Sequence, residues 1–368
     1  MSFHQPGAAT ACVILCLSAI PANATTRAVS PSGNDTTAVQ KAINASATGD
    51  IVQFNAGNYY LSGVTLKSGV SLQGVAGAVL HDTADSVPIF QLNPSDSHDI
   101  SLSALNFVGT GVDTSHGAVE LIGDTFTSTN GSNHISVMNC TFKKNGLRWV
   151  ILKNSVISGN TVSDIPTQWG SALFGYYADS VTITHNTITN VFQPISMVNS
   201  GADQGANIVV SYNKASGISR MGIEIQGQGG TNETTNLLVQ GNNFTKWVNP
   251  VADGNTIAYS IVTTGTGTRV LDNYAQGKVS TGIGIEISGA GAAAKYNYMD
   301  GFAMGIIGYM TRDNISYNNV INNAWGPSAQ INTFGRTDEI VVGNTSDPNL
   351  PIPFGSPTLG APLSTAAN

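Results

Sequence analysis

A short unit recurs along most of this chain, and it limits the folds that the chain can adopt. The unit is clearest at 207–227, NIVVSYNKASGISRMGIEIQG, which reads as a strand, an Asn turn, a second strand, a loop and a third strand. Repeats of this size, with no long helical pattern, predict a solenoid in which each coil pairs only with its two neighbours. The turn residues follow one another at spacings of 21 to 31 residues: Asn139, Asn160, Asn186, Asn213, Asn242, Asn273, Asn297, Asn318 and Asn344.

The Asn column has a physical reason. Asn tolerates the dihedral angles of tight turns, and side-chain amides that stack from coil to coil can hydrogen-bond to one another. An apolar alternation precedes most of the column, as Val181 and Ile183 do before Asn186. We therefore expect the column to line one edge of a parallel β-helix.

Two segments near the N-terminus carry the pattern of a known superfamily. They are DTTAVQKAINAS (35–46) and DIVQFNAGNYYLSGVTLKSGVSLQGVAGAVL (50–80). This order resembles the opening of the pectate-lyase-like superfamily: a short helix, a strand, a "PAG-Y-L" turn and a strand ending in "L-G". The stretch FNAG (54–57) has Asn where that superfamily usually has Pro.

The resemblance implies an all-β fold, a single-stranded right-handed parallel β-helix of about ten coils with a short N-terminal capping helix. The resemblance predicts the fold but does not specify the reaction, because the superfamily contains lyases, hydrolases, epimerases and non-enzymes. The helix is expected at about 35–47, with Asp35 as N-cap and Val39, Ala42 and Ile43 on its apolar face.

The remaining organisation follows from the ends of the chain. The apolar stretch 8–20 and the A-x-A pattern at 22–24 predict a signal peptide at 1–24, and hence a secreted protein, extracellular or periplasmic. One β-helix domain is expected at 25–347, followed by a Pro-rich tail at 348–368 that cannot continue a ladder. No later segment is apolar enough for a membrane span.

The composition limits the kinds of molecule that the protein is expected to bind. The net charge is −7 with only 15 Lys plus Arg, which argues against nucleic acid and against a strongly polyanionic ligand. Cys140 is the only Cys outside the expected leader, and we expect a buried thiol with no disulfide. The His residues are scattered, so neither a metal site nor a cofactor is expected, although loop carboxylates are compatible with Ca²⁺.

Two glutamates are the strongest catalytic candidates. In the superfamily that the chain resembles, the groove follows the sheet that precedes the loop to the next coil. Here that sheet is formed by the third strand of each unit, which we call the GIEI-type strand because GIEI occurs in it at 222–225 and 284–287. Glu224 and Glu286 hold the same outward slot two coils apart, which places their Cα atoms roughly 10 Å apart. Their carboxyl groups can then reach the separation of roughly 6.5–9.5 Å that inverting glycosidases use. Ser260 or Val262 would form the floor between them.

The two glutamates are expected to differ in charge. The one shielded by Trp247 and the loop at 246–256 would have a raised pKa and act as general acid. Glu224 is the expected ionised partner because Arg220 lies four residues before it. The candidate substrate-binding residues are Arg220, Lys246, Trp247, Asp203, Asp253, Trp169 and Tyr309.

Each of these candidates has a second interpretation. Arg220 either binds a substrate hydroxyl or carboxylate, or anchors a loop. Asp203 and Asp253 either complete a carboxylate cluster or cap turns. Trp169 and Trp247, both expected in loops, either stack on sugar rings or cover the edge of a coil.

Three functions remain open at this level. The first is a secreted hydrolase or glycosyl transfer enzyme that cleaves a poly- or oligosaccharide with Glu224 and Glu286. The second is a polysaccharide lyase or epimerase acting on a uronate polymer, with Lys153, Arg220, Lys246 or Lys278 as base. The third is a non-catalytic carbohydrate-binding or adhesin solenoid.

Overall fold

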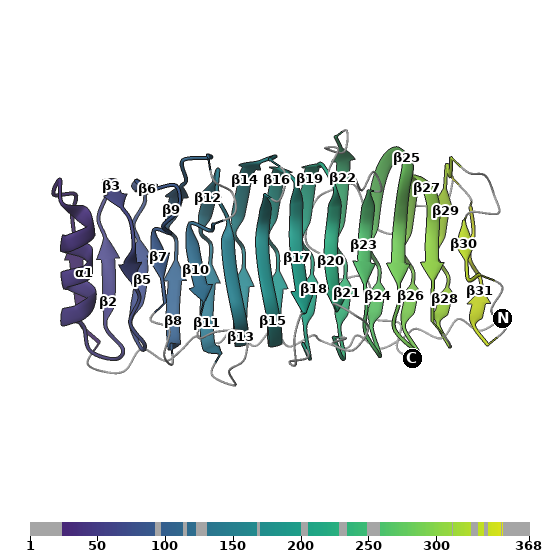
Figure 1. Cartoon of the computed structure of the whole chain (residues 1–368), viewed down its shortest axis with the longest axis horizontal. Helices are drawn as coiled ribbons and strands as arrows, with labels where there is room; N and C mark the ends of the chain where they lie inside the picture. The colour runs from purple at the N-terminus through teal and green to yellow at the C-terminus, as the bar shows by residue number, and fades with distance from the viewer. Residues whose placement is uncertain are drawn as a thin grey trace, which may run out of the picture.

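The computed structural model describes residues 24–92, 97–112, 116–122, 131–167, 170–199, 205–227, 234–248, 258–310, 312–324, 330–334, 338–346 and 348. Within these residues the chain winds into a parallel β-helix, whose coils follow one another from α1 at one end to β31 at the other (Figure 1). Each regular coil contributes one strand to each of three sheets, and every strand pairing is parallel. The fold expected from the repeat is therefore confirmed.

The first sheet carries the GIEI-type strands. Its rungs are β4 (Val64–Thr65), β7 (Phe90–Gln91), β10 (Val119–Ile122), the first parts of β13 (Leu147–Ser158) and β15 (Ser171–Thr184), β17 (Gln193–Asn199), β20 (Met221–Gly227), β23 (Tyr259–Thr263), the last parts of β25 (Tyr274–Ile287) and β27 (Tyr298–Gly308), and β30 (Ile331–Asn332).

The second sheet holds the strands that enter the Asn turns. Its rungs are β1 (Thr26–Val29), β2 (Ile51–Phe54), β5 (Ser71–Gly74), β8 (His98–Ser103), β11 (Ser132–Met138), the last parts of β13 and β15, β18 (Val209–Ser211), β21 (Leu238–Gln240), β24 (Arg269–Leu271), β26 (Ala293–Lys295), β28 (Asn314–Ser316) and β31 (Ile340–Val342).

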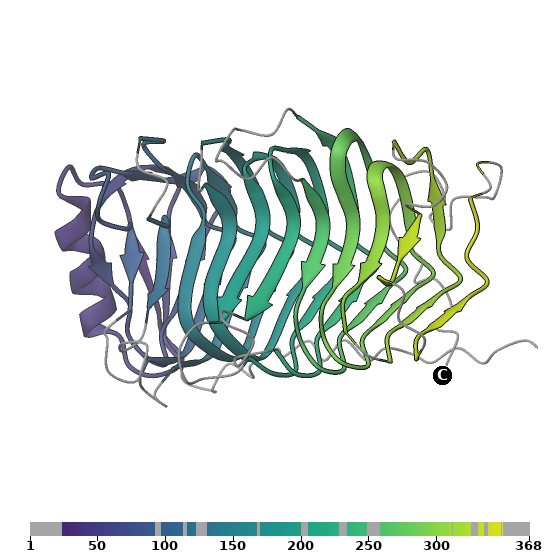
Figure 2. The ribbon, with the colours of Figure 1, turned by 45° about the vertical axis from the view of Figure 1, so that its right-hand side comes forward.

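The third sheet holds the strands that leave those turns. Its rungs are β3 (Gly57–Leu61), β6 (Ala78–Asp82), β9 (Asn106–Val108), β12 (Thr141–Lys143), β14 (Thr161–Ile165), β16 (Thr187–Val191), β19 (Lys214–Ile218), β22 (Asn243–Trp247), the first parts of β25 and β27, and β29 (Asn319–Ile321). The turned view in Figure 2 shows the coils stacked in register.

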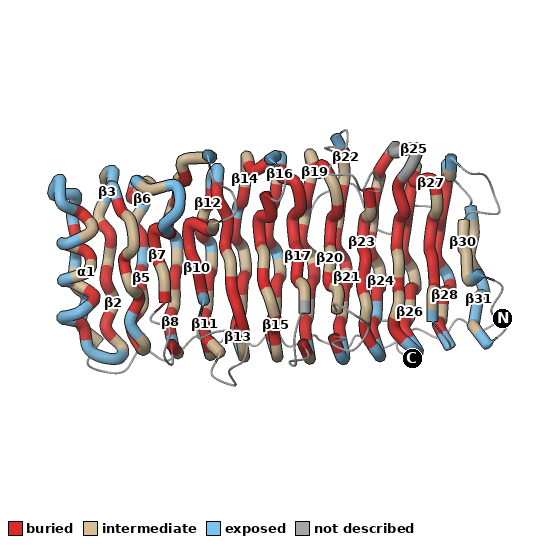
Figure 3. Tube along the Cα trace, viewed as in Figure 1, coloured by how far each residue is buried: buried red, intermediate tan, exposed pale blue. Residues whose placement is uncertain are grey.

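The core fills the space between the sheets. Ile223 and Ile225 on β20 and Ile285 and Ile287 on β25 are fully buried, as the alternation in these strands predicts. Buried and partly exposed positions alternate along the rungs in Figure 3. Burial of each such side chain stabilises the fold by about 1.5–3 kcal/mol, which fixes the register of the outward residues.

The Asn column forms a continuous buried ladder. The side-chain Oδ1 of Asn213 accepts hydrogen bonds from the backbone N (3.0 Å) and Nδ2 (2.9 Å) of Asn186, and Asn213 repeats both bonds to Asn242 at 3.0 Å. The same pattern links Asn160 to Asn186 and runs on to Asn344. The expectation that these amides share one edge is confirmed.

Asn139 does not belong to this ladder, although the spacing predicted that it would. Asn139 is exposed, with a left-handed backbone (φ 54°), and Cys140 takes the ladder position. The backbone N of Cys140 donates to Oδ1 of Asn160 at 2.9 Å. In the later coils the left-handed residue likewise precedes the ladder Asn, as Tyr212 (φ 55°) precedes Asn213, so the column is shifted by one residue here.

Helix α1 (Asp35–Ala45) covers the N-terminal end of the stack and buries Val39 and Ile43, as predicted. It ends two residues before the expected limit, and its N-cap is Asn34 rather than Asp35. The Asp35 carboxylate instead accepts hydrogen bonds from the backbone N of Ser32 at 2.7 Å and of Tyr60 at 2.9 Å. It therefore ties the helix to strand β3.

Candidate functional site

One outward row of the first sheet brings the candidate glutamates together. The register pairs Ser196 of β17 with Glu224 of β20, Glu224 with Val262 of β23, and Val262 with Glu286 of β25. The next rung adds Ile307 of β27. The two glutamates therefore hold equivalent positions two rungs apart, and parallel rungs at about 4.8 Å place their Cα atoms roughly 10 Å apart. Val262, not Ser260, is the residue between them.

Glu224 is held by neighbours from two preceding elements. Its Oε2 accepts a hydrogen bond from Nε2 of Gln193 at 2.6 Å and another from Oγ of Ser196 at 2.9 Å. A guanidinium nitrogen of Arg220 lies 3.9 Å from the same oxygen and donates to Oε1 of Gln193 at 3.2 Å. The side chains of Arg220 and Glu224 are each only 12% exposed, so this is a shielded ion pair.

Arg220 itself is fixed from the other side. Its guanidinium lies over the ring of Phe192 at 5.9 Å from the centroid, and its carbonyl accepts a hydrogen bond from the indole Nε1 of Trp247 at 3.2 Å. The ion pair therefore lies at the corner between the third and first sheets.

Glu286 has different surroundings. Burial raises the pKa of its carboxyl group, and hydrogen bonds with Ser288 and Tyr259 lower that pKa in part. The Ser288 hydroxyl lies 3.5 Å from Oε1. No cationic side chain is among the causes of this shift. The protonated form of Glu286 is therefore favoured relative to an ordinary glutamic acid.

Tyr259 and Tyr309 adjoin Glu286. Burial raises the pKa of Tyr259 to about 12, with further contributions from the charge of Glu286 and from Tyr309. Burial and Glu286 also raise the pKa of Tyr309. The Tyr309 ring stacks on Phe334 with centroids 4.8 Å apart and planes at 19°, and Phe334 is 55% exposed. An aromatic surface therefore lies beside the buried carboxyl group.

The two carboxyl groups thus face the same row in contrasting environments. One is hydrogen-bonded and paired with a guanidinium, and the other is partly buried beside two phenols. A carboxyl group whose pKa is raised by burial, as that of Glu286 is, is suited to act as an acid. The arrangement can donate a proton from one rung and accept a proton two rungs away.

Trp247 does not line this site, contrary to the prediction from its sequence position. It is the last residue of strand β22 rather than part of a loop, and it is only 9% exposed. Its ring packs edge-on against Phe302 (5.5 Å) and Phe244 (6.5 Å) in the core. Its contribution is to support Arg220, through the hydrogen bond from its indole to the Arg220 carbonyl.

Lys246 also lies on β22, exposed and with a left-handed backbone (φ 57°), and the structure shows no contact between it and either glutamate. Asp203, Asp253 and Trp169 lie outside the described residues. Of the predicted substrate-binding set, Arg220 and Tyr309 are the two that the described structure brings beside the glutamates.

Sequence reasoning missed Gln193, Ser196, Tyr259 and Ser288. Two of them carried a usable signal, because Ser196 fills the slot of Glu224 in the copy PISMV and Tyr259 lies in the copy AYSIVT. The other two lie just outside the aligned strand pattern, and only their hydrogen bonds to the glutamates reveal them.

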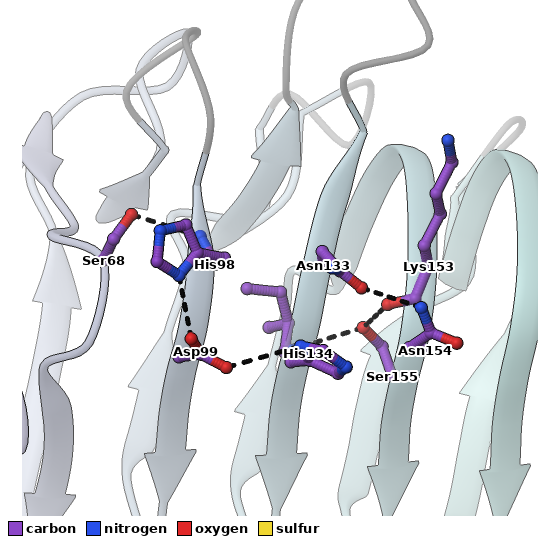
Figure 4. Close-up of polar contacts among 9 residues, drawn as sticks. Ser68, His98, Asp99, Asn133, His134, Lys153, Asn154 and Ser155 are labelled. Atoms are coloured by element: carbon purple, nitrogen blue, oxygen red, sulfur yellow. Dashed lines mark hydrogen bonds and ion pairs between the residues drawn. The ribbon is translucent and has the colours of Figure 1, made fainter.

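A second polar cluster lies at the corner between the first and second sheets, in the earlier coils (Figure 4). Nδ1 of His98 lies 2.8 Å from one oxygen of Asp99, and Nδ1 of His134 lies 3.4 Å from the other. All three side chains are largely exposed. Lys153 lies at this corner and extends away from the cluster. Among the described residues no group of three or more His, Cys, Asp or Glu side chains is arranged to hold a metal ion.

No protein-family model matches the chain, and no curated protein matches it. Solved structures do match in fold. A mannuronic acid specific polysaccharide family 6 lyase from human gut microbiota aligns over 87% of this chain and 78% of that chain, with TM-score 0.58 and 14% identity. The polygalacturonase of Erwinia carotovora ssp. carotovora covers 88% and 92%, with TM-score 0.52 and 12% identity.

A third similar structure is PfbA, a surface adhesin of Streptococcus pneumoniae, with TM-score 0.54, 14% identity and coverage of 82% and 90%. These likenesses show the parallel β-helix fold that the chain shares with a lyase, a hydrolase and an adhesin. In the part of the chain that the structure describes, no helix combines the length and apolar character needed to cross a membrane.

Proposed function

We propose that the protein is a carbohydrate-active enzyme that cleaves glycosidic bonds of a poly- or oligosaccharide bound along the first sheet. The observation that carries this proposal is the pair Glu224 and Glu286, in one outward row two rungs apart and in opposite electrostatic surroundings. The fold shared with polysaccharide-acting enzymes supports it. The leader-like N-terminus supports action outside the cell.

The proposed reaction is hydrolysis with inversion. Glu286, whose burial favours its protonated form, donates that proton to the glycosidic oxygen as the bond from the anomeric carbon breaks. Glu224 takes a proton from the water whose oxygen forms the new bond on the opposite face of the sugar. The contacts of Glu224 with Gln193, Ser196 and Arg220 all converge on Oε2, so Oε1 is the oxygen that receives this proton.

The side chains around the pair have binding roles in this proposal. The exposed Phe334 ring and the Tyr309 ring stacked on it offer an apolar face to a sugar ring beyond Glu286. Arg220 holds Glu224 and offers its guanidinium to a substrate hydroxyl or carboxylate. The site therefore has one aromatic and one polar side.

The test is a panel of neutral and uronic polysaccharides incubated with the wild-type protein, Glu224→Gln and Glu286→Gln. New reducing ends without unsaturated products, lost in both variants, are the expected result. Proton NMR of the first product should show the inverted anomer.

Two outcomes would replace the proposal. Unsaturated, ultraviolet-absorbing products from a uronate polymer would mark a lyase, and binding without any product would mark a carbohydrate-binding solenoid. A retained anomer would keep the glutamates but change their roles to nucleophile and acid/base.

A further inference from the structure

We propose that Gln193 is a positioning residue of the reaction. Its side-chain amide keeps the guanidinium of Arg220 from closing on both oxygens of Glu224, and so leaves one of those oxygens to the attacking water. This inference rests on the proposed function. It is carried by the hydrogen bonds of one shielded cluster on the first sheet.

Gln193 is placed by the register of that sheet. It is the first residue of β17, where it pairs with Ser171 of β15, and it is 2% exposed. Its side chain reaches Glu224 on β20, the next rung. Ser196, on the same strand, is the register partner of Glu224 and is 1% exposed. Two buried polar side chains of one strand therefore hold the carboxylate.

Both ends of the Gln193 amide are used. Nη1 of Arg220 donates to Oε1 of Gln193 at 3.2 Å, and Nε2 of Gln193 donates to Oε2 of Glu224 at 2.6 Å. A guanidinium offers only donors and an ionised carboxylate offers only acceptors, so each partner requires the same orientation of the amide. A glutamine satisfies both partners without adding a charge of its own.

The amide links a cation to a carboxylate that stand slightly apart. Nη1 of Arg220 lies 3.9 Å from Oε2 of Glu224, whereas a direct charge-assisted hydrogen bond measures roughly 2.7–2.9 Å. Arginine commonly binds a carboxylate through both oxygens. Such a bidentate pair would occupy Oε1 of Glu224 as well as Oε2.

The backbone of Arg220 is fixed, so its side chain is the part that can close this gap. Its backbone N donates to the carbonyl of Phe192 at 3.0 Å, and its carbonyl accepts from Nε1 of Trp247 at 3.2 Å. A movement of the guanidinium by about 1 Å would bring it into direct contact with Glu224. The hydrogen bond to Gln193 opposes that movement.

The two oxygens of Glu224 are consequently unequal. Within the described residues, the hydrogen bonds from Gln193 and Ser196 and the approach of Arg220 all involve Oε2. Two fixed donors on one oxygen restrict rotation of the carboxylate plane, which is how supporting hydrogen bonds hold a catalytic group in its productive geometry. Oε1 then remains directed to the water whose proton it accepts.

The first experiment is Gln193→Met, which keeps an unbranched side chain of similar length and removes both ends of the bridge. A crystal structure of the variant should show the guanidinium of Arg220 in contact with both oxygens of Glu224. Because the base is then misplaced and partly occupied, kcat should fall roughly 10- to 100-fold.

A second variant, Gln193→Glu, keeps an acceptor for Arg220 and places a carboxyl group against Glu224. The ascending limb of the pH profile of kcat/KM reports the ionisation of the base. That limb should move to lower pH by about one unit in Gln193→Met, where the cation comes closer, and to higher pH by about one unit in Gln193→Glu. A packing defect alone would not move the limb in opposite directions.

The other charged and titratable groups near the pair are the same in both variants: Arg220, Tyr259, Glu286 and Tyr309. Gln276→Met is the matched control. Nε2 of Gln276 donates to Oδ2 of the buried Asp300 at 2.8 Å on the third sheet, so this variant loses the same kind of bond away from the site. Its kcat and pH limb should equal those of the wild type, and thermal melts confirm that all variants are folded.

The outcomes separate this inference from the proposed function. If Glu224→Gln abolishes turnover while the two Gln193 variants keep the wild-type kcat and pH limb, the role of Gln193 is overturned and the reaction stands. A structure of Gln193→Met in which Arg220 keeps its separation of 3.9 Å from Glu224 would overturn that role as well. If Glu224→Gln retains wild-type turnover, the proposed function itself fails.

Discussion

Glu224 and Glu286 are separated by a single intervening residue in space, Val262, although 61 residues of chain lie between their positions in the sequence. The separation of their Cα atoms is set by the hydrogen bonds of the sheet and not by a loop. A pair placed on rungs of a sheet is held more precisely than a pair placed on mobile loops.

Replacement of either glutamate by glutamine should remove proton transfer while preserving shape. We expect turnover on the true substrate to fall by about 10²–10⁴-fold in Glu224→Gln and in Glu286→Gln. Glu120→Gln is the control, since Glu120 belongs to the same outward row four rungs before Glu224. Retention of wild-type rates by both variants would show that the two glutamates take no part in catalysis.

The same Glu286→Gln variant should also change the pH dependence of stability. The pKa of Glu286 is raised above its ordinary value of 4.5 in the folded protein, so the unfolded chain releases this proton first as pH rises. The wild type therefore loses stability from pH 4.5 up through the raised pKa, whereas the glutamine variant loses none from this position.

Thermal melts of the two proteins from pH 4 to pH 8 provide the measurement. The melting temperature of Glu286→Gln relative to the wild type should increase with pH across this range. A constant or decreasing difference would show that burial does not penalise the carboxylate here.

Loss of an interior ladder amide should be costly. Asn213→Ala removes the acceptor of the backbone N of Asn186 and the donor to the carbonyl of Ile183, and both groups are buried. We expect unfolding free energy to fall by about 3 kcal/mol. Asn344→Ala, at the partly exposed end of the ladder, should cost less than about 1 kcal/mol. Equal effects in urea unfolding would argue against a continuous ladder.

Cys140 should be inert in the folded protein. It is 1% exposed, and burial raises its thiol pKa to about 12, so almost no reactive thiolate forms at pH 8. After treatment with iodoacetamide, peptide mapping should find Cys140 unmodified in the native protein and modified in urea. Rapid native labelling would contradict the buried position.

Phe334 should contribute to substrate binding and not to proton transfer. Its exposed ring stacks on Tyr309, and Phe334→Ala should raise KM roughly five- to tenfold while leaving kcat nearly unchanged. Tyr60→Ala serves as control, because Tyr60 is 58% exposed and its ring stacks on His81 near the N-terminal end. Equal KM values in both variants would show that Phe334 does not form an aromatic subsite.

The fold was predictable because it depends on a repeated pattern. The alternation around Ile223 and Ile285 sets which side chains face outward, and that was enough to place the two glutamates on one row. The Asn spacing located the turns, but it could not show that Cys140 replaces an Asn in the ladder. Spacing alone does not reveal the one-residue shift of the left-handed turn.

The surroundings of the glutamates were harder to predict. Trp247 is the last residue of strand β22. Its indole lies in the core, where it packs edge-on against the rings of Phe244 and Phe302. Gln193 reaches Glu224 through a long side chain from the neighbouring rung. Such contacts depend on side-chain direction, which a sequence period does not specify.

The ladder from Asn160 to Asn344 also has a direction. Each Oδ1 accepts from the coil before it and each Nδ2 donates to the coil after it, so all the side-chain amide dipoles point the same way along the axis of the molecule. Hydrogen bonds in such a chain polarise one another, and each becomes stronger as the chain lengthens. The amide hydrogen bonds at the centre of the ladder are therefore strengthened by coils with which they make no contact. Removal of coils from either end of the solenoid should weaken amide hydrogen bonds far from the deleted coils.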